Sequence, residues 1–173
     1  MQNRDRLMKG ARLAVRAAWV ANRLFLMAVV LGLLCSWIFS GVFAAFLSRS
    51  IARSDLPSVM AGMRVELLLG VAMSVVTDRL LLALAAIVAS AGAGDPFTAD
   101  NVRRLRYMGW CLLALQLFVI PGYLIGVCFP AMGPAAPHPD ISVAGWISVL
   151  MIFVLARVFA TGSAMRDDLE GTV

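Results

Sequence analysis

The chain has 173 residues, of which 61% are hydrophobic and 14% are charged, and its mean hydropathy is +0.88. Soluble globular domains are usually about 45–50% apolar, so this composition excludes an ordinary soluble domain and indicates a membrane protein. The net charge of +5 would suit a nucleic-acid-binding protein. However, the basic residues cluster at the ends of apolar stretches, where they orient membrane helices, so we expect no direct contact with nucleic acid.

Residues 1–23 precede the first apolar stretch and are predicted to form a basic, amphipathic N-terminal arm. Arg12, Arg16 and Arg23 lie near one face of the predicted helix, and Trp19 falls where an interfacial aromatic residue is expected. We expect the arm to lie on the membrane surface and to contact anionic lipid headgroups. A docking site for a cytoplasmic protein is the alternative.

Four apolar stretches follow, at residues 24–47, 67–93, 107–129 and 141–160. A helix needs about 20 residues to cross a hydrocarbon core of ~30 Å, and each stretch meets that length. The stretches are continuously apolar, which excludes the alternating pattern of a membrane barrel. The sequence therefore predicts an all-α membrane protein, in which residues 24–173 form a single bundle of four transmembrane helices.

The basic residues also predict how the bundle is oriented. They are dense before the first stretch, between the second and third stretches, and at the end of the fourth. The connection between the first and second stretches carries Arg49, Arg53 and Arg64, and the connection between the third and fourth carries none. Because positive charge is retained in the cytoplasm, we expect both termini to be cytoplasmic.

Small residues recur at every fourth position of the first stretch and allow another helix to approach closely. We expect this face to pack inside the bundle, and a homo-oligomer is the alternative. The third stretch contains Pro121-Gly122, which predicts a kink, and a Gly-x-x-x-Gly pair. The residues of the two small-residue patterns are Gly32, Ser36, Ser40, Ala44 and Ser48 in the first stretch, and Gly122 and Gly126 in the third.

Polar side chains inside the apolar stretches form a candidate intramembrane site, made of Asp78, Arg79, Gln116 and Arg157. A charge at the bilayer centre costs about 2.5–3.5 kcal/mol on insertion scales, so such residues face the protein, water or a partner. One interpretation is a structural clasp, in which Gln116 bonds Asp78 or Arg79. The other is a site that responds to a ligand or a proton.

The sequence shows no pattern typical of an enzyme. It holds three cysteines and one histidine, without the close Cys/His spacing of a zinc site or a nucleophile–base arrangement. We therefore predict no catalytic residues, no metal site and no cofactor.

The most distinctive segment, Ala91–Trp110, joins the second and third stretches. Gly94 is expected to end one helix, the Asp95-Pro96 pair to force an extended turn, and Thr98 to cap the next helix. Asn101, three residues after Thr98, partly imitates the Glu or Gln of a capping box.

This segment carries a family resemblance. PFTADNVRRLRYMGW, together with the C-terminal FVLARVFATGSAMRDDLEGTV, resembles the bacterial domain-of-unknown-function family 2975 (DUF2975). The resemblance implies a four-span protein of the bacterial inner membrane without an established activity. Its members are often encoded beside a small helix-turn-helix regulator, which implies a cytoplasmic DNA-binding partner. Asp78-Arg79 departs from the family pattern, so any role for that pair stands on this sequence alone.

The hypothesis that follows is a membrane regulatory or scaffolding protein that binds a cytoplasmic partner. Acidic residues of the tail would pair weakly with arginines of the loop, as a latch that binding can open. The alternative is a small transporter or channel component, or an accessory subunit of a membrane complex, that uses the intramembrane polar site. The predicted partner-binding residues are Pro96, Phe97, Asn101, Arg103, Arg104, Arg106, Asp167, Asp168 and Glu170.

Overall fold

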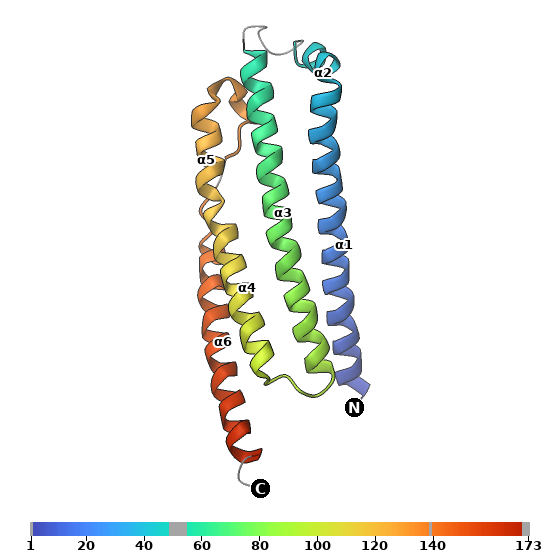
Figure 1. Ribbon diagram of the computed structural model, residues 1–173, viewed down its shortest axis with the longest axis vertical. Helices are drawn as coiled ribbons and strands as arrows, with labels where there is room; N and C mark the ends of the chain where they lie inside the picture. The colour runs from blue at the N-terminus through green and yellow to red at the C-terminus, as the bar shows by residue number, and fades with distance from the viewer. Residues whose placement is uncertain (1, 49–54, 139, 171–173) are drawn as a thin grey trace. The chain divides into compact units, whose positions relative to one another are not determined.

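The computed structural model describes the backbone of residues 2–48, 55–138 and 140–170, and within these ranges all regular structure is helical (Figure 1). Side chains are not described for residues 2–5, 47 and 167–170. In chain order the elements are α1 (Gln2–Ile38), α2 (Ser40–Leu47), α3 (Leu56–Gly92), α4 (Ala99–Leu117), α5 (Val119–Cys128), the 3-10 helix η1 (Pro130–Ala135) and α6 (Val143–Glu170).

Four stretches of this helical structure are long and apolar enough to cross a membrane. They are Arg6–Ile38, Leu56–Gly92, Ala99–Cys128 and Val143–Arg166. The predicted all-α class is thereby confirmed, with four helices long and apolar enough to span a membrane, and the chain is a multi-pass membrane protein.

Two helix boundaries differ from the expected spans. Helix α1 continues through residue 23 without interruption, because the preceding residues are rich in the strong helix formers Ala, Leu and Arg. Helix α3 begins at Leu56, and Pro57 is tolerated because it lies in the first turn. Arg64 therefore belongs to a helix, and its assignment to the connecting loop was wrong. Arg49 and Arg53 lie outside the described residues.

The chain divides into two compact units, which are described separately. One unit comprises Met1–Asn22, Val76–Gln116 and Ser142–Val173, and the other comprises Arg23–Val75 and Leu117–Ile141.

In the second unit, α1 and α3 approach each other through small residues. A Cβ atom added to Gly70 would lie 3.5 Å from Val29, and one added to Gly32 would lie 3.8 Å from Leu67. Ser36 is 5% exposed. The expected internal packing of the small-residue face is thus confirmed at Ser36, whereas Gly32 and Ser40 of the same face are exposed.

Arg64 ties the same two helices together by polar contacts. Its guanidinium donates a hydrogen bond of 2.6 Å to the carbonyl oxygen of Ser36 and one of 3.4 Å to the hydroxyl of Ser36. It also lies over the ring of Trp37, 4.9 Å from the centroid. These contacts provide partners for a charged residue that lies within the first turns of a helix long and apolar enough to span a membrane.

Pro121 breaks the third span at the position that backbone chemistry requires. Proline lacks an N–H and its ring clashes with the carbonyl four residues earlier, which here belongs to Leu117. Helix α4 ends at Leu117 and α5 begins at Val119. The predicted interruption is confirmed, and it lies at Phe118, three residues before the proline itself.

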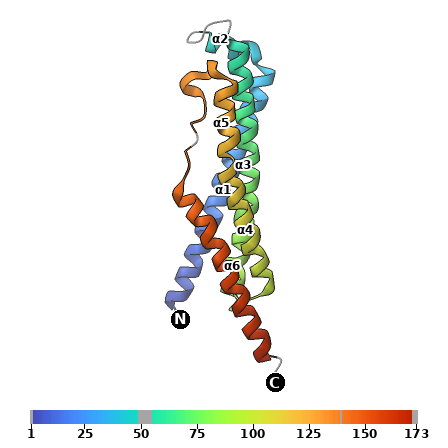
Figure 2. The same cartoon turned by 90° about the vertical axis from the view of Figure 1, so that its left-hand side faces the viewer.

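The second unit ends in an irregular segment. The second unit has a buried apolar cluster, formed by Val59 of α3, Ile125 of α5 and Met132 of η1. Figure 2 shows the stretch that leads from η1 to α6, where residues 136–138 and 140–142 form no helix. Pro137 accounts for this, since proline restrains the residue before it to extended backbone, and Ala136 has φ −66° and ψ 145°.

In the first unit, α4 and α6 pack closely through a glycine. A Cβ atom at Gly109 would lie 2.8 Å from the Phe153 ring. Trp110 meets the same ring edge-on, with centroids 5.7 Å apart. At the start of α6, the hydroxyl of Ser142 accepts a 3.1 Å hydrogen bond from the backbone N–H of Gly145, as an N-cap does.

Candidate functional site

The distinctive loop and the end of α6 form one end of the first unit, which we call the loop face. It comprises the loop at residues 93–98, the first turns of α4 and the last turns of α6. Helix α3 ends here in a Schellman motif: the N–H of Asp95 bonds the carbonyl of Ser90 and the N–H of Gly94 bonds the carbonyl of Ala91, both at 3.2 Å. Gly94 has φ +91°, a conformation that glycine adopts without a steric penalty.

Thr98 and Asn101 then fix the start of α4. The hydroxyl of Thr98 accepts a 3.2 Å hydrogen bond from the backbone N–H of Asn101, which confirms the predicted N-cap. The side chain of Asn101 does not complete a capping box. Its amide instead donates to the hydroxyl of Ser90 at 2.5 Å and to the carbonyl of Pro96 at 2.8 Å.

Asn101 is therefore the central residue of the loop face. Its side chain is fully buried, and its carbonyl oxygen accepts a 2.9 Å hydrogen bond from Arg104. The residue joins the end of α3, the loop and the start of α4. A buried amide without hydrogen-bond partners would cost about 1–3 kcal/mol. Loop conformations that break these bonds are therefore disfavoured, and the bonds of Asn101 specify one conformation of the loop.

Phe97 connects the loop to α6. Its ring packs against Phe159 in a tilted arrangement, with centroids 4.9 Å apart and an interplanar angle of 41°. Gly162 makes room for it, because a Cβ atom there would lie 2.9 Å from the Phe97 ring. The ring remains 42% exposed, so Phe97 both anchors the loop and presents apolar surface.

Ion pairs complete the loop face. Asp95 pairs with Arg166 of α6, and Asp100 pairs with Arg103 within the first turns of α4. The loop-to-tail contact thus joins a loop acid to a tail arginine, the reverse of the predicted polarity. The predicted acidic partners, Asp167, Asp168 and Glu170, lie outside the described side chains.

The predicted partner-binding residues differ in how accessible they are. Arg103 and Arg106 are exposed, Pro96 and Arg104 are half-buried, and Asn101 has no exposed surface. The arginines and Phe97 are therefore accessible to a partner. Asn101 is not accessible and contributes by holding the loop in its conformation.

Sequence reasoning did not assign five residues to the loop face, although the sequence contained an indication for three of them. Phe159, Gly162 and Arg166 lie within the C-terminal segment that carries the family resemblance, and the glycine beside an aromatic residue indicated a close contact. The two others are Ser90 and Asp95. Asp95 was expected only in the turn, since its ion pair with Arg166, like the bond between Ser90 and Asn101, depends on the folded loop and leaves no pattern.

The intramembrane polar residues also belong to the first unit. Asp78 is buried, whereas Arg79 and Arg157 are exposed. The Gln116 amide donates a 3.1 Å hydrogen bond to the carbonyl of Ser142, rather than the predicted bond to Asp78 or Arg79. Gln116 thus holds the start of α6 against α4.

The described residues contain no group of three or more histidine, cysteine or acidic side chains that could hold a metal ion. Cys35, Cys111 and Cys128 are free thiols. The chemistry available on the loop face is therefore that of guanidinium, carboxylate and aromatic groups.

Comparison with known proteins identifies a family. A family model described as "Protein of unknown function (DUF2975)" matches residues 52–173, which is well over half of the chain and includes the whole loop face. The match confirms the resemblance noted from the sequence. No curated protein and no solved structure matches the chain.

Proposed function

The chain belongs to the DUF2975 family, whose function is unknown, and we propose that it is a membrane regulatory or scaffolding protein. Its loop face would bind a cytoplasmic protein partner. In this proposal the protein lies in the bacterial inner membrane with both termini in the cytoplasm, as the distribution of basic residues favours.

The observation that carries the proposal is the contrast between Asn101 and its neighbours. Asn101 is 0% exposed and holds the loop through hydrogen bonds, while Phe97, Arg103 and Arg106 face outward. A surface whose backbone is already ordered loses little entropy on binding. Aromatic and arginine side chains are also the residue types most often found at energetic hot spots of interfaces.

The exposed groups define the chemistry of the partner. The loop face exposes Arg106, Arg103 paired with Asp100, and part of the Phe97 ring. These groups favour a protein surface that is acidic and carries an apolar contact. A small helix-turn-helix regulator held at the membrane is the candidate that the family resemblance suggests. The Asp95–Arg166 pair is exposed on both sides, at 44% and 45%, so its opening on binding would cost little.

The experiment is affinity capture of the tagged full-length chain from native membranes, followed by identification of bound proteins. We expect a cytoplasmic protein to be recovered by the wild type and lost in Arg103→Glu/Arg106→Glu. A matched control is Arg6→Glu/Lys9→Glu, which makes the same charge change on exposed residues of α1. Truncation after Ala164 removes Arg166 and tests the tail. Recovery of no cytoplasmic protein by wild type and truncated chain alike would overturn the proposal.

A second function, a small transporter or channel component, is favoured by the start of α6. Along α4, Gln116 lies ten residues or about 15 Å beyond Arg106, and it bonds Ser142 at the N-terminus of α6. If Arg106 marks the membrane border, α6 begins near the middle of the ~30 Å hydrocarbon core. Helices that begin at this depth form binding sites in transporters, and buried Asp78 is an ionisable group in the same unit.

Ion or solute flux into liposomes tests this second function. Asp78→Asn should abolish a flux that the wild type supports. Asp55→Asn, at an exposed acid outside the long apolar part of α3, should leave it unchanged. Equal flux in the two variants would exclude a role for Asp78.

A further inference from the structure

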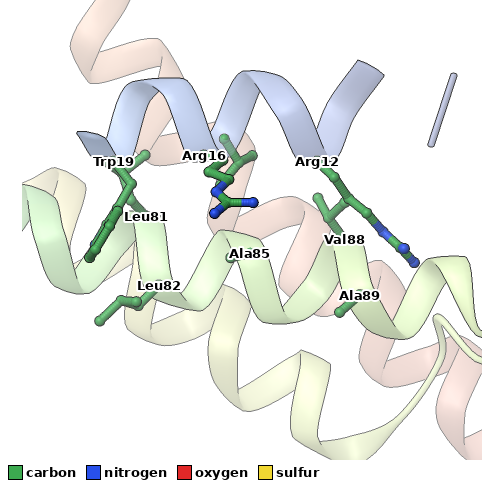
Figure 3. Close-up of a pocket in the computed structure, with 9 residues that line it drawn as sticks. Arg12, Arg16, Trp19, Leu81, Leu82, Ala85, Val88 and Ala89 are labelled. Carbon is green, nitrogen blue, oxygen red and sulfur yellow. The ribbon is translucent and has the colours of Figure 1, made fainter. Parts of the chain in front are cut away.

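A groove with a volume of about 480 Å³ lies between the first half of α1 and the last turns of α3, within the first unit (Figure 3). Pockets that bind small molecules usually enclose about 300–1,000 Å³, so the groove is large enough for a ligand. Apart from two arginines its lining is apolar and consists of Val15, Trp19, Leu81, Leu82, Ala85, Val88 and Ala89.

The two arginines give the groove its charge. Arg12 and Arg16 both line it, and Figure 3 shows the guanidinium of Arg16 directed toward α3, whereas Arg12 extends away from Arg16, past Ala89 and toward the end of α3. The Arg12 guanidinium also contacts Gly92, where the absence of a side chain leaves space for it. No acidic residue is among the described residues that line the groove. The groove is therefore complementary to an anion.

Polar and apolar groups are separated along the groove. Arg12 lies at one end and Trp19 at the other, seven residues or about 10 Å apart along α1. The arginine end is level with the loop face, because Ser90, next to Ala89, bonds Asn101. The Trp19 end, with Leu81 and Leu82, lies deeper in the apolar part of α3. A phospholipid has the same order of groups, with its phosphate at the border and its acyl chain inside.

We propose that this groove binds one anionic phospholipid. The phosphate is held by Arg16 and, once its side chain turns from Gly92 toward Arg16, by Arg12 one helical turn away, and an acyl chain lies along Leu81, Leu82, Ala85 and the ring of Trp19. A guanidinium group binds a phosphate through two parallel hydrogen bonds. Basic residues beside membrane helices also select anionic lipids. The site is separate from the partner-binding residues of the loop face, so it stands or falls independently of the proposed function.

The first test counts the lipids retained by the full-length protein, using native mass spectrometry after extraction from nanodiscs. The probes are phosphatidylglycerol and phosphatidylcholine with identical acyl chains. We expect one phosphatidylglycerol per chain, retained at least about tenfold better than by Arg12→Gln/Arg16→Gln, since charge-assisted hydrogen bonds are lost. Arg6→Gln/Lys9→Gln removes the same charge from residues outside the groove and should retain the lipid as the wild type does.

A second variant separates the apolar part of the site from its charge. Ala85→Phe fills the groove and leaves both arginines in place, so it should also release the lipid. Trp19 provides a readout that works even where lipid dissociates in the gas phase. In a chain whose other three tryptophans are replaced by Phe, brominated phosphatidylglycerol should quench Trp19 fluorescence, and Ala85→Phe should reduce this quenching. Circular dichroism establishes that each variant is folded.

Several results would overturn the proposal. Equal loss of lipid in the two charge variants would mean that only overall charge attracts it. Equal retention of phosphatidylcholine would show that the arginines do not select the headgroup. Displacement by excess inorganic phosphate would show that the acyl chain contributes nothing. A lipid-free dimer that dissociates in Ala85→Phe would show that a second copy of the chain occupies the groove.

Discussion

The side-chain amide of Asn101 donates a 2.8 Å hydrogen bond to the carbonyl oxygen of Pro96, five residues earlier in the chain. This bond closes the loop between α3 and α4 onto the first turn of α4. The same amide reaches Ser90 in the last turns of α3. A single buried side chain therefore sets the shape of the loop face on which the proposed function depends.

Replacing Asn101 should destabilise the protein more than removing the N-cap of α4 does. Asn101→Ala leaves the Pro96 carbonyl and the Ser90 hydroxyl without this donor, and we expect a loss of about 2–3 kcal/mol in the free energy of unfolding. Chemical denaturation in mixed micelles, followed by circular dichroism, measures it. Thr98→Ala removes only the N-cap and should cost about 1 kcal/mol. Equal losses would show that the Asn101 side-chain bonds contribute nothing beyond the cap.

A pair of glycines tests the contact between the loop and α6. Gly162→Ala places a Cβ atom 2.9 Å from the Phe97 ring, and overpacking of this kind should cost about 1–3 kcal/mol. Gly10→Ala has no neighbour within 4 Å and should stabilise α1 by up to about 1 kcal/mol, as Gly to Ala changes in helices do. If the two substitutions shift the thermal midpoint in the same direction, the contact between Phe97 and Gly162 is not formed in the membrane.

The Asp95–Arg166 pair should behave as a weak contact. Both side chains are nearly half exposed, so a double-mutant cycle with Asp95→Ala and Arg166→Ala should give a coupling energy below about 1 kcal/mol. The coupling should also fall as salt is added. A larger, salt-independent coupling would mean that the pair is a fixed part of the fold and cannot serve as a latch.

Arg64 should matter for the stability of the second unit. Arg64→Leu removes the hydrogen bonds to Ser36 and the contact with the Trp37 ring, and we expect a cost of about 2–3 kcal/mol. Arg64→Lys keeps the charge and loses the second donor, so it should cost less. Stability unchanged in Arg64→Leu would show that the packing of α1 on α3 does not need this residue.

The fold was largely predictable from the sequence because lipid leaves a membrane chain few choices. Every backbone group in hydrocarbon must be paired within its own segment, so the length of the apolar stretches predicts helices directly. The turn at Gly94, the cap at Thr98 and the break caused by Pro121 follow from single-residue chemistry and were all predicted. The end of α1 at Ile38 has no such signal in the sequence.

The candidate site was predictable only in part. The loop was identified from its residues, but the partners of Asn101 were not, because its bonds to Ser90 and Pro96 depend on the folded loop. Gln116 was expected to bond Asp78 or Arg79, and it bonds Ser142 instead. This partner, Ser142, immediately precedes α6. Tertiary packing determines where α6 begins, and the length of an apolar stretch does not reveal it.

The most direct test of the central claim is photo-crosslinking in living cells from single positions before and after the apolar stretch 107–129. A photoreactive amino acid at Arg103 or Arg106 should capture a cytoplasmic protein, and the same amino acid at Gly133 of η1 should not. Capture of no cytoplasmic protein at Arg103 and Arg106, or equal capture at Gly133, would contradict the account.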